Sequence, residues 1–130
     1  MKPFAPMLGK YVPKEPQNST DGTILSVCHH FSENMKREDA EEKLRSVFRN
    51  FSPKAMVDHV ILGHFKGTIR YGESIFAISI TREDVLDETD NDAWKALTIL
   101  PEGQVTVNLL SVVPVSITER ELKQTIQLFF

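Results

Sequence analysis

The sequence predicts an α+β fold with the ferredoxin-like (split β-α-β) order of strands and helices around an antiparallel sheet. The longest run of strand-forming residues, Val57 to Arg82, lies in the middle of the chain. Segments with helical spacing of apolar residues lie before and after it. At 130 residues and 41% hydrophobic content, the chain is long enough for one core and too short for two. We therefore expect a single domain over residues 23–130, preceded by an extended N-terminal arm over residues 1–22.

The central run is predicted to fold back on itself as a β-hairpin. Its turn signal is Tyr71-Gly72-Glu73-Ser74, in which glycine at the first central position favours a type II′ turn. The face expected to be buried carries Phe65, Gly67, Ile69, Phe76, Ile78 and Ile80. The opposite face carries His64, Lys66, Thr68 and Arg70. A one-residue slip would mix the two sets, so the apolar alternation supports the same turn independently.

Local patterns predict the elements on either side of the hairpin. Residues 23–31 alternate as a strand whose outward side chains are Ser26, Cys28 and His30. Apolar spacing predicts a helix over residues 34–51, which Ser52-Pro53 should end. The acidic stretch 83–92 is expected to be a loop leading into a short helix that closes before Pro101.

The C-terminal part of the domain is predicted to contribute a strand and an additional helix. Residues 104–113 alternate as the last strand, with Val105, Val107 and Leu109 inward. Thr118 and Glu121 have the spacing of a capping box at the start of the final helix.

The N-terminal arm is rich in proline, at Pro3, Pro6, Pro13 and Pro16. This density favours extended backbone and excludes a regular helix. The arm also carries apolar side chains that are too many for a solvated tail, namely Phe4, Met7, Leu8, Tyr11 and Val12. We expect the arm to lie over its own domain, with a neighbouring subunit as the alternative.

Composition excludes several partners and settings. A net charge of −3 and a pI of about 5.8 give no global attraction to nucleic acid or to an anionic membrane. The predicted outer sheet face lacks the aromatic residues with which sheets bind RNA. No apolar run approaches the length of a membrane span. Cys28 is the only cysteine, so the chain can form no internal disulfide and a cytoplasmic location is expected.

The first candidate site is a cationic row on the predicted hairpin. Lys66 and Arg70, with Thr68 between them, could hold the carboxylate or phosphate of an anionic ligand. The competing interpretation is an edge strand that carries Lys and Arg to prevent edge pairing, and the absence of a Gly-rich phosphate loop favours it.

Cys28, His30 and His64 are the weaker candidates for a catalytic or metal site. The two strands that carry them should be separated by another strand, about 9–10 Å apart, which is too far for zinc bonds of about 2.0–2.3 Å. We therefore expect neither a metal nor a cofactor within one subunit, although a site shared by two subunits escapes this objection. Cys28 as a nucleophile would need a thiolate-stabilising environment, and no known nucleophile motif surrounds it. His29 and His59 are expected to face the core.

The function favoured by these patterns is a small binding or regulatory module that self-associates through its sheet face, sheet edge or arm. Apolar residues among the polar groups of the outer face suit contacts between subunits. The alternative is a small enzyme or carrier for an anionic metabolite bound by Lys66 and Arg70, with His30 or His64 as acid/base. The expected partners are thus a second copy of the chain or a small anion.

Overall fold

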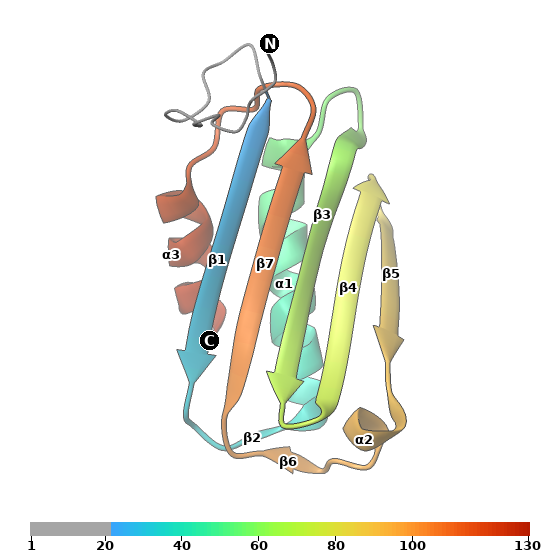
Figure 1. The fold of residues 1–130 in the computed structure, drawn as a ribbon, viewed down its shortest axis with the longest axis vertical. Helices are drawn as coiled ribbons and strands as arrows, with labels where there is room; N and C mark the ends of the chain where they lie inside the picture. Colours follow the sequence, from blue (N-terminus) through green and yellow to red (C-terminus); the bar gives the residue numbers. More distant parts are fainter. Residues whose placement is uncertain (1–21) are drawn as a thin grey trace, which may run out of the picture.

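The computed structural model describes residues 22–130, which form a five-stranded antiparallel sheet with its two long helices on one face (Figure 1). The predicted arm, residues 1–22, lies outside the described residues except for Gly22. The elements are β1 (Thr23–Phe31), β2 (Met35–Lys36), α1 (Arg37–Ala55), β3 (Val60–Tyr71), β4 (Ser74–Arg82), β5 (Val85–Asp90), α2 (Asp92–Lys95), β6 (Ile99–Leu100), β7 (Gly103–Ser111) and α3 (Glu119–Phe129). None of the helices in this part of the chain is long and apolar enough to cross a membrane.

The central hairpin confirms the predicted register. Tyr71 pairs with Ser74 and Ile69 with Phe76. Gly72 has a φ of +59°, whereas Glu73 does not have a positive φ, which is the pattern of a type II′ turn. The predicted inward side chains are buried, and Lys66 and Arg70 are exposed. The apolar alternation therefore determines which face of the hairpin meets the helices.

α1 supplies the largest helical contribution to the core. Leu44, Val47, Phe48 and Phe51 are fully buried, and the Phe48 ring packs at 4.5 Å between centroids on Phe65 of β3. The predicted end of this helix at Ser52-Pro53 is wrong, because α1 continues to Ala55. A proline removes one backbone hydrogen bond, and here the loss falls in the last turn, where burial of Ala55 offsets it.

α3 begins at the predicted capping box. The Thr118 hydroxyl accepts a hydrogen bond from the Glu121 backbone N–H, and the Glu121 carboxylate accepts one from the Thr118 backbone N–H. Leu122 and Ile126 are fully buried, and α3 packs on β1 and α1.

The ferredoxin-like strand order is not confirmed, although the α+β class is. The order across the sheet is β1-β7-β3-β4-β5, so the last strand is inserted between β1 and β3. The predicted short helix before Pro101 is present as α2. The acidic stretch departs from the prediction, because instead of a loop it forms β5 along the free edge of β4. Charged side chains on β5 are compatible with strand structure because an edge strand can direct them into solvent.

Candidate interface at the open face and free edge of the sheet

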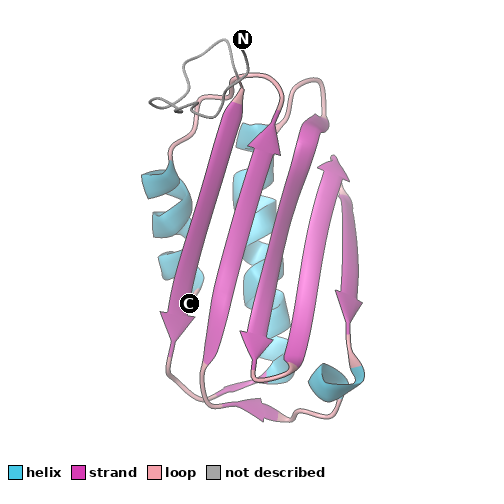
Figure 2. Cartoon of the chain, viewed as in Figure 1, coloured by secondary structure: helices cyan, strands magenta, loops and turns pink. Residues whose placement is uncertain are grey.

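The sheet face opposite α1 and α3 has no helix of the described chain over it (Figure 2). We call it the open face. The strand register arranges its side chains in rows that run across β1, β7, β3 and β4. These rows are Ser26-Asn108-Lys66-Ser79, then Cys28-Thr106-Thr68-Ala77, then His30-Gln104-Arg70-Ile75.

The predicted anion-binding residues lie in the middle of the open face. Lys66, Thr68 and Arg70 stand on β3, beside the amide and hydroxyl side chains that β7 contributes to the same rows. No acidic side chain of the described residues lies within ion-pair distance of Lys66 or Arg70. The edge-strand interpretation of these cations is wrong, because β3 has a neighbour on each side.

The structure does not bring Cys28, His30 and His64 together. β7 lies between β1 and β3, as expected from the sequence, and His64 is in register with Leu110 while His30 is in register with Gln104. His30 lies 3.2 Å from the carboxylate of Glu102. The thiol of Cys28, which is exposed, accepts a hydrogen bond from the Gln104 amide at 2.8 Å.

The two inward histidines that we expected differ in their environment. His29 is half-buried between β1 and α3. Burial lowers the pKa of His29, and the neighbouring charges of His30 and Lys123 lower it further. Both effects favour the neutral form of His29. The expectation for His59 is wrong, because this residue is exposed at the turn before β3 and lies 2.9 Å from Glu83.

An apolar corner occupies the end of the open face where β1 begins. Ile24 and Val112 are 72% and 67% exposed, and Leu110, opposite Ile24, is 40% exposed. Exposed apolar groups that adjoin one another on a sheet are typical of surfaces that bind other proteins.

The two edges of the sheet differ in how they resist pairing with another strand. β5 carries Asp87, Glu88 and Asp90, and its pairing with β4 is irregular near Arg82. Charge and irregularity of this kind protect an edge. β1 pairs with β7 without a bulge over all nine residues and contains no Pro, Lys, Arg, Asp or Glu. Its backbone hydrogen bonds within the described chain all go to β7, so no strand of residues 22–130 pairs with its outer edge.

The sequence patterns missed a cavity of about 540 Å³ on the helix side of the sheet. It is lined by residues 49–56 of α1 and its C-terminal cap and by residues 80–86 around the β4–β5 turn. These two segments are distant in the sequence and follow no known motif. Only the fold brings them together, so no local signal could have identified the cavity.

Comparisons with known proteins assign no family. No family model matches the chain, and no curated protein matches it. Among solved structures, the Zn(II)-bound triple mutant of the YjiA GTPase is similar at 9% identity and a TM-score of 0.41, over 82% of this chain and 29% of that one. A likeness at this level carries no argument about fold or function.

Proposed function

We propose that this protein is a self-associating binding module whose copies pair edge to edge through β1. The observation that supports it is the contrast between the two edges, since β5 is acidic and irregular whereas β1 is long, regular and free of Lys, Arg, Asp and Glu. The outer N–H and C=O groups of such a strand are a ready template for another strand. The lowered pKa of His29 favours its neutral form, which suits an edge without charge.

A second copy is the partner that this edge fits. Two antiparallel copies of β1 related by a two-fold axis would pair along the nine residues of the strand and continue the sheet from one subunit into the next. An axis perpendicular to the sheet keeps both open faces on the same side. Lys66, Thr68 and Arg70 of the two copies would then lie on one continuous sheet surface. A cytoplasmic location belongs to the same proposal, because the single exposed thiol of Cys28 suits a reducing compartment.

Sedimentation velocity with two matched variants tests the pairing. Cys28 and Thr106 are register partners on the open face, so Cys28→Lys and Thr106→Lys place the same charge at the same height on neighbouring strands. We expect the wild type to sediment as a dimer. Cys28→Lys should be monomeric, because it brings two like charges close to the dimer axis, and Thr106→Lys should remain dimeric.

Three results would contradict edge pairing. The first is a wild type that sediments as a monomer even as its concentration is raised. Dimers that survive Cys28→Lys and dissociate with Thr106→Lys would show association through the open face instead. Failure of a short thiol-to-thiol crosslinker to join two copies through Cys28 would also count against it, since pairing centred near this residue puts the two thiols within about 8 Å.

A second candidate function is the binding of a small anion on the open face. Lys66 and Arg70 lie without acidic partners in the described chain, and Asn108 and Gln104 stand beside them in the same rows. Cations next to amide donors suit a carboxylate or phosphate. We propose inorganic phosphate and citrate as probes, with loss of binding in Lys66→Ala/Arg70→Ala as the expected result. An enzyme of this kind would need His30 or His64 as acid/base, and His30→Gln and His64→Gln test that role.

A further inference from the structure

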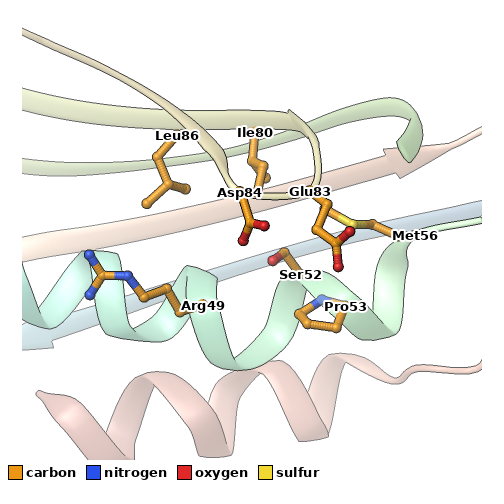
Figure 3. Close-up of a pocket in the computed structure, with 8 residues that line it drawn as sticks. All are labelled: Arg49, Ser52, Pro53, Met56, Ile80, Glu83, Asp84 and Leu86. Atoms are coloured by element: carbon orange, nitrogen blue, oxygen red, sulfur yellow. The ribbon is translucent and has the colours of Figure 1, made fainter. Parts of the chain in front are cut away.

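The groove between α1 and the β4–β5 hairpin contains a cavity of about 540 Å³ (Figure 3). α3 packs on β1 at the other edge of the sheet, and α2 packs on β4 near Phe76. Near the β4–β5 turn, the described helix that faces the sheet is therefore α1. The volume lies within the range of about 300–1,000 Å³ that is typical of small-molecule sites. The cavity is on the opposite side of the sheet from the open face.

Two carboxylates from the β4–β5 turn are directed into this cavity. Figure 3 shows Glu83 and Asp84 extending from the turn toward α1. Asp84 has no basic side chain of the described residues within ion-pair distance, and the one partner of Glu83 is His59, at 2.9 Å. Among the described residues that line the cavity, the one cation is Arg49, and its guanidinium is bound to Glu42 at 2.8 Å. The unbalanced charge at the cavity is therefore negative.

The hydroxyl of Ser52, a largely buried residue of α1, faces the two carboxylates from the other wall. Ser52 is only 4% exposed, lines the cavity from α1, and makes no hydrogen bond to another described residue. Many helical serines donate a hydrogen bond to the carbonyl four residues earlier. The Ser52 oxygen is thus available to a group inside the cavity.

The backbone of the turn holds the carboxylates in place. Asp84 has a φ of +63°, a conformation that aspartate tolerates better than most residues. The Glu83 N–H donates to the carbonyl of His59 at 2.8 Å, and the His59 ring holds one Glu83 oxygen. The turn is therefore tied to the loop that precedes β3.

The remaining walls are apolar, formed by Met56, Ile80 and Leu86. We propose that this cavity binds an organic ammonium ion, whose charge lies between Glu83, Asp84 and Ser52 and whose carbon chain lies against these apolar walls. A metal ion fits less well, because no group of three His, Cys, Asp or Glu side chains in the described chain could hold one. This binding is independent of pairing through β1.

Nuclear magnetic resonance titration with hexylammonium chloride tests the proposal. We expect chemical shift changes centred on Ser52 and Asp84 that saturate and weaken as salt is raised. Hexanoate, with the same carbon chain and the opposite charge, should cause none of them. Absence of saturable changes with hexylammonium, or equal changes with hexanoate, would overturn the proposal.

Charge-neutral variants locate the binding groups. Asp84→Asn retains a side chain suited to the positive φ, and Glu83→Gln retains a hydrogen-bond partner for His59. Each should weaken hexylammonium binding about tenfold, because a charge-assisted hydrogen bond is lost. Asp87→Asn, on β5 outside the cavity, is the matched control and should bind like the wild type. Equal affinity in the Glu83→Gln/Asp84→Asn double variant would contradict the site.

The ammonium group could belong to a free metabolite or to a lysine side chain of another protein. Spermidine and N-acetyl-lysine methylamide represent these two sources. Binding of either one at Ser52 and Asp84 supports the proposal, and the tighter of the two identifies the source. Binding of neither would overturn it.

Discussion

The guanidinium of Arg45 on α1 donates two hydrogen bonds to the carboxylate of Glu88 on β5. Nε lies 2.6 Å from one carboxylate oxygen and Nη2 lies 2.9 Å from the other. The two side chains are 24% and 31% exposed, and the hydrogen bond from Arg45 holds the pKa of Glu88 below its usual value. A paired fork of this geometry is stronger than a single surface ion pair. It fastens the added edge strand to the helix layer.

Replacing Glu88 by Gln should lower the free energy of unfolding at neutral pH by about 1–2 kcal/mol. The lowered pKa means that this stabilisation is present above pH 4.5, the ordinary value, and is lost as the pH falls through the folded-state pKa. Urea unfolding of the wild type and Glu88→Gln should therefore converge in acid. Asp87→Asn, with no ion pair among the described residues, is the control and should change stability little at either pH.

Glu41 is expected to hold α2 in place through a hydrogen bond from Trp94. Its Oε2 accepts hydrogen bonds from the indole N–H of Trp94 at 2.7 Å and from Arg37 at 3.1 Å, in a largely buried position. Glu41→Ala would leave the Trp94 N–H without a partner and should cost about 1–3 kcal/mol. Glu41→Gln keeps an acceptor and should cost less. Trp94 is the only tryptophan, so its fluorescence reports the change directly, and equal effects of the two variants would contradict this role.

Any side chain at Gly67 is expected to destabilise the fold, because Phe48 of α1 packs directly against this glycine. A Cβ at this position would come within 2.6 Å of the Phe48 ring. Gly67→Ala should therefore destabilise the protein by about 1–3 kcal/mol through overpacking. Thr68→Ala, on the open face, should cost much less. Adding Phe48→Leu to Gly67→Ala should recover part of the loss in thermal unfolding, and strict additivity of the two changes would argue against the contact.

His29 should make stability depend on pH between the pKa values of the unfolded and folded states. Its folded pKa lies below 6.5 because of burial, so the unfolded chain takes up a proton first as the pH falls. Stability is then lost as the pH drops below 6.5 through the folded pKa. His29→Gln should flatten this part of the profile of unfolding free energy against pH, and an unchanged profile in this variant would contradict the role of His29.

Local patterns predicted the parts of the fold that local chemistry controls. The limits of β1, the register at Gly72 and the cap at Thr118 all follow from residues within one element or one turn. They could be predicted because burial of one face makes the alternation unambiguous. The outward direction of Lys66 and Arg70 followed from the same alternation.

The parts that were not predicted depend on contacts between distant segments. β5 has no apolar alternation over Asp87 to Asp90, and it is a strand because β4 offers a free edge and Arg45 offers a charge partner. The strand order depends on how the crossovers pass over the sheet, which no single segment encodes. For the same reason the sequence did not show the cavity at Ser52, although it did predict that another strand separates His30 from His64.

The insertion of β7 between β1 and β3 has a consequence for synthesis of the protein on the ribosome. Thr23 pairs with Ser111 and Phe31 with Gly103, so most of the polypeptide must emerge before β1 can join its own sheet. Until then the nine residues of β1, which include no Lys, Arg, Asp or Glu, have no strand of their own chain to pair with. Two neighbouring chains on one polysome could therefore pair through this segment before either has finished folding. A molecular chaperone that binds the nascent chain would prevent such pairing.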